Sequence, residues 1–159
     1  MKIQRILIAV DDSKYSENAA SYGFDLARNY GADVGLVNIV EVIIPPPMGT
    51  NDMLAPAYEN ELANDPELLD AQKSASENII DRTIKNFAGN LNVTHFTDYG
   101  PTADGILKCA SEFSADMLVL GTHSRTGLDR LLMGSTAEHV VRHSEIPVLV
   151  VPLREAESQ

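Results

Sequence analysis

The sequence predicts an α/β fold, a three-layer sandwich in which a five-stranded parallel sheet carries helices on both faces. Apolar stretches of strand length alternate with longer stretches whose apolar residues have helical spacing. The strand-like stretches are almost continuously apolar, which is typical of parallel strands covered on both faces. No internal repeat or domain break is visible, so we expect a single domain over residues 1–153, followed by a frayed tail at 154–159.

The first half of the chain contains signals for two strands and two helices. Side chains from Asp11 to Ser13 can cap a helix, and Gly31 suits the left-handed residue that ends one. Pro66 follows Asp65 as a first helical residue follows its N-cap. The expected order is a strand at 2–10, a helix at 14–30, a strand at 34–42, a long loop at 45–66 with a helical turn near 58–62, and a helix from 66 to about 88.

The second half contains signals for three strands and two helices. Residues 92–97 are more polar than the other strands, which predicts an edge strand. Thr102 can cap the next helix, and Ser135 with Glu138 has the spacing of a capping box, which places the start of the last helix at Ser135. The expected order is a strand at 92–97, a turn at 98–102, a helix at 103–114, a strand at 116–120, a glycine-containing loop, a helix at 135–143 and a strand at 146–151.

Composition excludes several classes of function. The 159 residues carry a formal net charge of −11, whereas nucleic acids and anionic membrane surfaces attract basic proteins. No 18 consecutive residues are apolar, and the apolar run at the N-terminus is too short for a signal peptide. The single cysteine, Cys109, cannot form an internal disulfide, and its place within a predicted helix favours a buried thiol. We therefore expect a cytoplasmic protein without nucleic-acid or membrane partners.

The stretch from Gly121 to Ser135 is the candidate functional segment, because it joins the end of an apolar strand to the start of a helix. The first N–H groups of a helix lack intrahelical partners and attract anions, and glycine allows a close approach of the backbone. Arginines and histidines outnumber acids over 121–143, which also favours an anion. A turn that binds nothing is the structural alternative.

Asp11 ends the first strand much as Gly121 ends the fourth. Ligands of open parallel sheets bind outside the carboxyl ends of the strands, where the strand order reverses. If the first and fourth strands are neighbours, as in the order 3-2-1-4-5, the two segments face the same place. The Asp11 carboxylate could then bind a base amino group, a ribose hydroxyl or a metal, unless it serves only the start of the first helix.

The glycine-containing segment resembles the motif of nucleotide-binding universal stress proteins, G-x2-G-x9-G followed by Ser or Thr. Gly121, Gly134 and Ser135 fit this frame, and Ser124 stands where the motif has its second glycine. The resemblance spans most of the chain, is most specific over 116–151, and implies the strand order 3-2-1-4-5. It implies a dimeric stress sensor or regulator that binds ATP, AMP or a cyclic nucleotide, with Mg²⁺ as a companion ion. Ser is bulkier than Gly, so a member that binds no nucleotide and acts through protein contacts is the alternative.

The resemblance also implies which residues form the site. Asp11 matches the residue that contacts the nucleotide, Ile39 lines the base pocket, and the motif positions hold ribose and phosphates. The residues expected to bind the nucleotide are Ala9, Val10, Asp11, Ile39, Leu120, Gly121, His123, Ser124, Arg125, Gly134, Ser135 and Thr136.

We expect neither catalytic residues nor a dedicated metal site. His139 and His143 have the i, i+4 spacing of a metal-binding pair, but no third ligand is evident and the helix dipole explains them. Nothing in the sequence resembles a nucleophile with an oriented base, so slow ATP hydrolysis is at most a second alternative.

The last strand, 146–151, is almost entirely apolar. An outermost strand of this kind is adhesive unless it is paired or covered. The family resemblance implies antiparallel pairing of this strand with that of a second copy, and hence a homodimer.

Overall fold

The computed structural model describes residues 2–41, 65–122 and 133–153. In chain order, the elements are β1 (Arg5–Ala9), α1 (Lys14–Tyr30), β2 (Asp33–Val40), α3 (Pro66–Phe87), β3 (Val93–Tyr99), α4 (Thr102–Phe113), β4 (Met117–Gly121), α5 (Ser135–His143) and β5 (Val148–Val151). The predicted loop at 45–66 falls almost entirely outside the described residues, as does the tail at 154–159.

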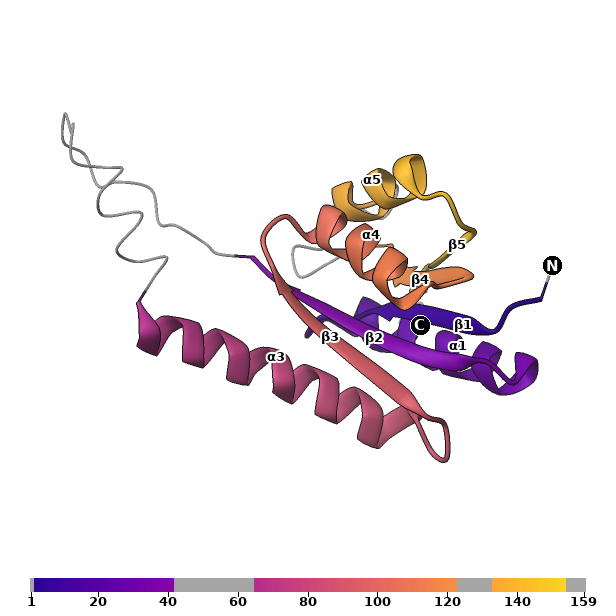
Figure 1. Ribbon diagram of the computed structural model, residues 1–159, viewed down its shortest axis with the longest axis horizontal. Helices are drawn as coiled ribbons and strands as arrows, with labels where there is room; N and C mark the ends of the chain where they lie inside the picture. Colours follow the sequence, from indigo (N-terminus) through magenta and orange to yellow (C-terminus); the bar gives the residue numbers. More distant parts are fainter. Residues whose placement is uncertain (1, 42–64, 123–132, 154–159) are drawn as a thin grey trace, which may run out of the picture.

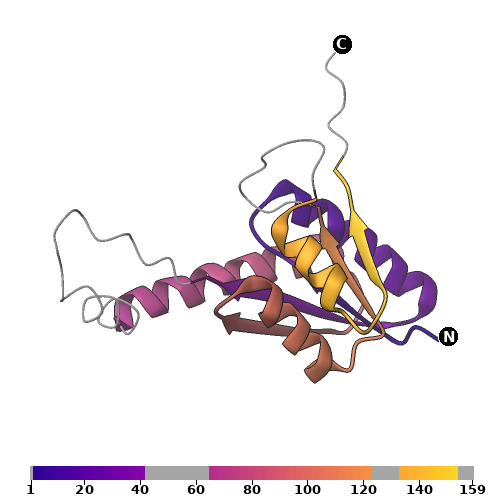
Figure 2. The same cartoon turned by 90° about the horizontal axis from the view of Figure 1, so that it is seen from above.

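The five strands form one parallel sheet with the order β3-β2-β1-β4-β5. Helices α1 and α3 cover one face, and α4 and α5 cover the other (Figure 1). Figure 2 views the molecule from the side of α4 and α5. The predicted three-layer sandwich, its strand order and the edge position of β3 are therefore confirmed.

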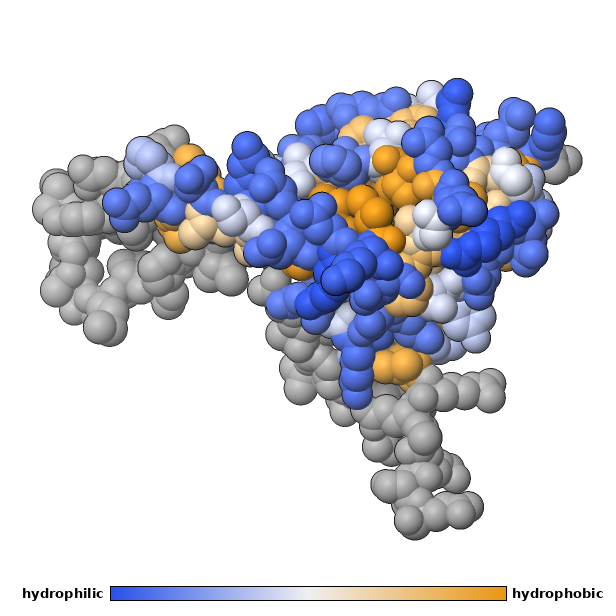
Figure 3. All heavy atoms as spheres, turned by 90° about the horizontal axis from the view of Figure 1, so that it is seen from below, coloured by the Kyte–Doolittle hydropathy of each residue, from blue (hydrophilic) through white to orange (hydrophobic). Residues whose placement is uncertain are grey.

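Each face of the sheet packs on its own apolar core, because successive side chains of a strand point to opposite faces. The core under α1 and α3 includes Ile6, Ile8, Phe24, Leu36, Ile80 and Val119. The core under α4 and α5 includes Leu7, Val37, Ile106, Cys109, Leu118, Leu120, Ala137 and Val140. On the face that carries α1 and α3, a central area of hydrophobic residues is surrounded by hydrophilic ones (Figure 3).

The signals for the first two long helices are confirmed. Ser13 is the N-cap of α1, and Gly31 ends that helix in the left-handed conformation with φ 64°. Asp65 caps α3, and Pro66 is its first residue. These ends were predictable because each depends on one side chain acting on the adjacent backbone.

Two predicted caps are wrong. Pro101 rather than Thr102 is the N-cap of α4, and Thr102 instead donates a hydrogen bond from its hydroxyl to Glu41. Gly134 rather than Ser135 is the N-cap of α5, which begins at Ser135 as expected but without a side-chain cap. In both helices the hydroxyl residue lies one position too far along the chain to accept from the first turn.

The predicted strands differ from the observed ones mainly at their ends. The strand expected at 2–10 is shorter, at Arg5–Ala9, and the one expected at 92–97 extends to Tyr99. The last strand begins at Val148 rather than at 146. Apolar residues beyond a strand's end, such as Ile3 and Val10, are buried without belonging to the ladder.

Candidate functional site

The structure brings the two candidate segments together at the carboxyl edge of the sheet. Strands β1 and β4 are parallel neighbours with Ile8 opposite Val119, so both end at this edge. The end of β4 also touches the first turn of α1, because a Cβ added to Gly121 would lie 2.8 Å from the Tyr15 carbonyl oxygen. The order of the strands reverses between β1 and β4, which is the position where such sheets bind ligands.

The start of α5 is open. Gly134 has φ −58° and ψ 153°, and no described residue caps the helix through its side chain. The Gly134 N–H donates to the Thr122 carbonyl at 2.7 Å, and the Gly134 carbonyl accepts the first helical bond from Glu138 at 3.0 Å. Within the described chain, the N–H groups of Ser135, Thr136 and Ala137 make no hydrogen bond. These amides and the positive end of the helix dipole can therefore receive an anion.

The start of α1 is closed by its own side chains. Ser13 Oγ accepts from the Ser16 N–H at 3.2 Å, and Ser16 Oγ accepts from the Asp11 N–H at 2.8 Å. The Asp11 carboxylate accepts from the Ser13 N–H at 2.8 Å through Oδ1. Asp11 therefore has the structural role that the sequence left open, with its side chain partly exposed at the edge of the sheet. The second carboxylate oxygen can still accept a hydroxyl or an amine.

The end of β2 presents backbone groups to the same edge. The Val10 N–H donates to the Val37 carbonyl at 2.9 Å, and the Asp33 N–H donates to the Gln4 carbonyl at 2.8 Å. Alternate residues of a strand direct their backbone groups to the same neighbour, so the N–H and C=O of Ile39 also point toward the line of β1. Because β1 ends at Ala9, these groups of Ile39 lie just past the last bridge, Ala9 to Val37.

A buried side chain takes the place of the next ladder bond. Asn38 Nδ2 donates to the Val10 carbonyl at 2.8 Å, and Asn38 is only 5% exposed. In the described residues, that carbonyl receives no bond from the Ile39 N–H, which would be its partner in a continuing parallel ladder. Asn38 was not among the predicted site residues, although it is the one polar residue within an apolar run from Leu36 to Val40.

Four predicted site residues occupy one side of the sheet at this edge. Leu120 is buried in the core under α4 and α5, and Ala9 and Ile39 pack against that core. Ile39 also lies against α4, where a Cβ on Gly105 would meet its Cδ1 at 2.6 Å. Thr136, in the first turn of α5, is adjacent to the buried Ala137 of the same core. A planar ring packed on Ala9 and Ile39 and an anionic group at the first turn of α5 could thus belong to one ligand.

Of the predicted site residues not yet placed, one lies in the other core and three lie outside the described part of the chain. Val10 packs into the core under α1 and α3, so only its backbone faces the edge between the strands. His123, Ser124 and Arg125 lie outside the described residues.

The basic residues of α5 have partners within the protein. Arg142 forms an ion pair with Glu138 at 2.8 Å, and His139 Nε2 lies 3.2 Å from Asp104 of α4. The rings of His139 and His143 stack with centroids 4.2 Å apart. In the parts of the chain that the structure describes, no group of three or more His, Cys, Asp or Glu residues could hold a metal ion.

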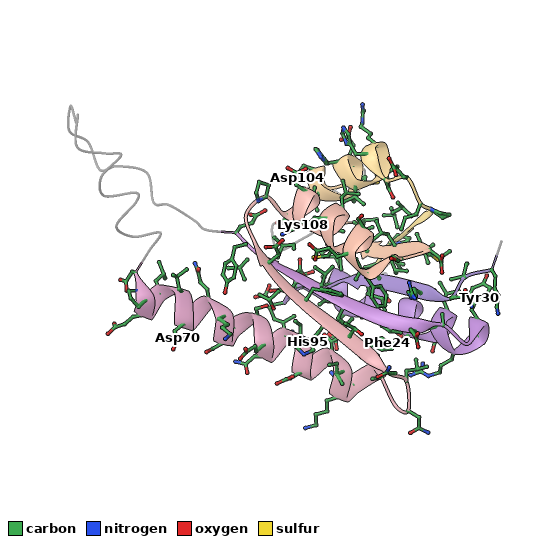
Figure 4. The ribbon with its side chains drawn as sticks, in the orientation of Figure 1. Phe24, Tyr30, Asp70, His95, Asp104 and Lys108 are labelled. Carbon is green, nitrogen blue, oxygen red and sulfur yellow. The ribbon has the colours of Figure 1, made fainter. Side chains whose placement is uncertain are left out.

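The groups whose pKa values are shifted lie on α4 and at the end of β3. The α4 residues Asp104 and Lys108 lie on the opposite side of the sheet from Phe24 (Figure 4). Lys108 donates to Asp98 at 2.8 Å, and this bond holds the pKa of Asp98 below its ordinary value. Cys109 is 2% exposed, which confirms the predicted buried thiol, and burial raises its pKa to about 11. Such a thiol is protonated at neutral pH and is a poor nucleophile.

Comparison with known proteins agrees with this geometry. The model of the universal stress protein family matches residues 2–152. A universal stress protein of Methanocaldococcus jannaschii is 30% identical over 153 residues, which cover 93% of this chain and 81% of the relative. Among the described residues, no helix has both the length and the hydropathy to cross a membrane.

Solved structures of the family share the fold. The universal stress protein UspA from Lactobacillus plantarum aligns with a TM-score of 0.74 and 24% identity, covering 95% of this chain and 99% of its own. A universal stress protein in complex with cAMP aligns with a TM-score of 0.61 and 22% identity over 95% of this chain and 98% of its own. A universal stress protein from Archaeoglobus fulgidus in complex with dAMP aligns with a TM-score of 0.61 and 19% identity, covering 94% of this chain and 98% of its own. With its sheet order, its open α5 and a family match over nearly its whole length, the chain belongs to the universal stress protein family.

Proposed function

We propose that this protein binds ATP or a related adenine nucleotide, such as AMP or a cyclic nucleotide, and acts as a stress sensor or regulator. The observation that carries the proposal is the start of α5, whose first amides have no partner in the described chain and lie at the edge where the strand order reverses. Two family members of the same fold have been solved with cAMP and with dAMP. Both ligands combine an adenine base, a sugar and a phosphate.

The phosphates would contact the amides of Ser135 and Thr136. Ser135 is exposed and Thr136 is partly exposed, so the start of the helix is accessible from outside. The Ser135 hydroxyl is not used as a cap and is available as a further donor. Mg²⁺ would accompany a triphosphate by neutralising its charge, which matters in a chain of net charge −11.

The base and the ribose would lie toward β1 and β2. An adenine edge offers an acceptor at N1 and a donor at its 6-amino group, which complement the N–H and the C=O of Ile39. The ribose hydroxyls would reach the Asp11 carboxylate, whose Oδ1 is held by the Ser13 N–H. Apolar contacts from Ala9 and Ile39 would cover the base.

The test is direct. Nucleotide released from the purified protein is identified by mass spectrometry, and Mg-ATP is titrated while the melting temperature is followed. We expect an adenine nucleotide and a rise in melting temperature, since a ligand that binds only the native state stabilises it. Asp11→Asn keeps an oxygen for the Ser13 N–H but loses the charge, so we expect it to fold and to bind ATP about tenfold more weakly.

A second candidate function is action through protein contacts without a nucleotide. One observation favours it: Gly121 is already required by its contact with the Tyr15 carbonyl, so this motif glycine is not by itself a sign of a ligand. If the protein is folded, releases no nucleotide and shows no change in melting temperature with Mg-ATP, this candidate is supported and the first is contradicted.

The protein would work as a homodimer through β5. This strand is the outer edge of the sheet, and Val148, Leu149 and Val150 are only partly buried. The Val151 carbonyl accepts from Thr122 and the Pro147 carbonyl accepts from Leu118, so the backbone groups of Val148 and Val150 point away from β4. These outward groups could pair with the same strand of a second copy.

Sedimentation at micromolar concentration tests the dimer, which we expect to be the main species. Val150→Pro removes an outward N–H without removing a bond to β4, and we expect it to produce a folded monomer. Leu149→Pro is the matched comparison, because it removes a bond within the sheet and should lower stability instead. A monomeric wild-type protein would contradict the dimer.

A further inference from the structure

We propose that Asn38 is a positioning residue for base recognition, which keeps the backbone N–H of Ile39 available for a nucleotide. This inference rests on the proposed function for its ligand, while its structural part concerns only β1 and β2. It follows from the hydrogen bond between Asn38 Nδ2 and the Val10 carbonyl, at 2.8 Å.

The bond occurs where the ladder between β1 and β2 stops. Up to Val10 the two strands exchange backbone bonds in regular alternation, ending with the Val10 N–H and the Val37 carbonyl at 2.9 Å. The next bond of a parallel ladder would join the Ile39 N–H to the Val10 carbonyl. The Asn38 amide occupies this carbonyl instead, so the bond that would consume the Ile39 N–H is replaced by a side chain.

Burial makes this replacement effective. Asn38 is 5% exposed, and its side chain lies on the face that carries α1 and α3, because alternate residues of a strand share a face and Val34 and Leu36 belong to the core under those helices. A buried carbonyl without a donor is unfavourable, so the Val10 carbonyl needs a partner. With Asn38 as that partner, the N–H and the C=O of Ile39 stay directed toward the edge between the strands.

The consequence is a preference for adenine over guanine. A donor and an acceptor side by side on Ile39 match the N1 and the 6-amino group of adenine, whereas guanine presents N1–H and O6, the reverse order. A site built to form specific hydrogen bonds rejects a ligand that leaves them unpaired. Asn38 therefore acts on base selectivity without touching the base.

The decisive variant is Asn38→Leu, which keeps a similar volume and removes the amide. The Val10 carbonyl should then accept a hydrogen bond from the Ile39 N–H, which extends the ladder between β1 and β2 by one bond. In protein without nucleotide, we expect hydrogen exchange of the Ile39 amide to be fast in the wild type and at least about tenfold slower in the variant. A variant that was merely destabilised would show faster exchange, so the direction of the change identifies the mechanism.

Nucleotide binding provides the second measurement. Calorimetry with Mg-ATP and Mg-GTP should show ATP binding about tenfold weaker in Asn38→Leu, the equivalent of one hydrogen bond, and GTP binding changed by less than about twofold. Thr97→Val is the matched control. Thr97 is the register partner of Asn38 on β3 and bonds Ser76 of α3 at 2.9 Å, and β2 separates its strand from β1. It should change neither the ATP-to-GTP ratio nor the exchange of Ile39.

The outcomes separate this inference from the proposed function. If no nucleotide binds the wild type, the proposed function fails, and the exchange of Ile39 still tests the role of Asn38. If Ile39 in the wild type is as protected as Val37, or if Asn38→Leu binds ATP and GTP as the wild type does, the inference is wrong. The wild-type exchange measurement decides the structural part even if the variant does not fold.

Discussion

Two helices begin near the same edge of the sheet, and their first turns are built differently. At the start of α1, Ser13 caps the helix and Ser16 binds back to Asp11, so side chains close the turn. At the start of α5, no side chain among the described residues caps the helix, and the N-cap is a glycine. Relative to glycine, a Ser, Asp or Asn cap stabilises a helix by roughly a few tenths of a kcal/mol, so α5 lacks a small stabilisation that α1 has.

The difference indicates a division of roles between the two ends. The closed turn of α1 fixes Asp11 and supports Gly121 through the Tyr15 carbonyl. The open turn of α5 leaves its amides without a partner in the described chain, as the proposed nucleotide site requires. A binding edge of this kind needs both parts, because a rigid side holds the geometry that a ligand then completes on the other side.

The largest effect is expected where the closed turn touches β4. Gly121→Ala would place a Cβ 2.8 Å from the Tyr15 carbonyl oxygen, and backbone cannot move aside cheaply. We expect the free energy of unfolding, measured by urea denaturation, to fall by about 3 kcal/mol. Hydrogen exchange should increase in the first turn of α1 more than in α5.

Gly31→Ala is the matched comparison for that variant. Gly31 has φ 64° and nothing within 4 Å of an added Cβ, so only backbone strain opposes the change. We expect the free energy of unfolding of Gly31→Ala to fall by about 1 kcal/mol. Equal losses at the two positions would show that the contact between β4 and α1 is not tight.

A pH titration compares the two cores, because Cys109 lies in the core that supports α5. Its pKa is raised from 9.0 to about 11, so above pH 9 the unfolded chain loses the proton while the folded chain keeps it. The free energy of unfolding is therefore unaffected by this group below pH 9 and falls as the pH rises toward 11, by about 3 kcal/mol at most. Denaturation of the wild type and of Cys109→Ala over this range should differ in slope, and parallel curves would contradict the burial of the thiol.

Alanine variants of Ser13, at the start of α1, and Ser135, at the start of α5, should differ in stability by a smaller amount. Ser13→Ala removes the oxygen that accepts from the Ser16 N–H, so we expect α1 to lose about 1 kcal/mol. Ser135→Ala removes no cap and should change stability by less than about 0.5 kcal/mol. Thermal denaturation of both variants measures the difference, and similar losses would mean that Ser135 caps α5 after all.

This contrast also marks what the sequence could predict. The alternation of apolar stretches was sufficient for the sandwich, and the cap at Ser13 could be read from residues adjacent to the helix. The cap of α5 could not, because Ser135 and Glu138 have the spacing of a capping box, but Ser135 is already the first helical residue and the N-cap is Gly134, while Glu138 pairs with Arg142. Local spacing does not fix which residue leaves the helical conformation.

The candidate site was predictable in its position but not in its construction. Asp11 and Gly121 follow strands whose ends meet at one edge, and strand order alone places them there. The roles of Asn38 and of the Tyr15 carbonyl depend on contacts between segments distant in the chain, which no local pattern encodes. A polar residue inside an apolar strand was the one available signal for Asn38.

The smallest change in stability should have the clearest effect on function. Gly134→Asp would give α5 the side-chain cap that it lacks, at a residue whose φ of −58° and ψ of 153° suit any amino acid. We expect the free energy of unfolding to rise by about 0.5–1 kcal/mol. The carboxylate would occupy the amides of the first turn, so the binding of Mg-ATP, measured by calorimetry, should weaken by at least about tenfold.

Gly134→Asn separates the two causes of that loss. Its side chain caps a helix about as well as Asp does but carries no charge. If occupation of the amides is what matters, Asn weakens ATP binding nearly as much as Asp; if charge repulsion dominates, Asn has a much smaller effect. Unchanged ATP affinity in both variants would mean that the phosphates do not bind at the start of α5, and the contrast between the two helix ends would then be structural only.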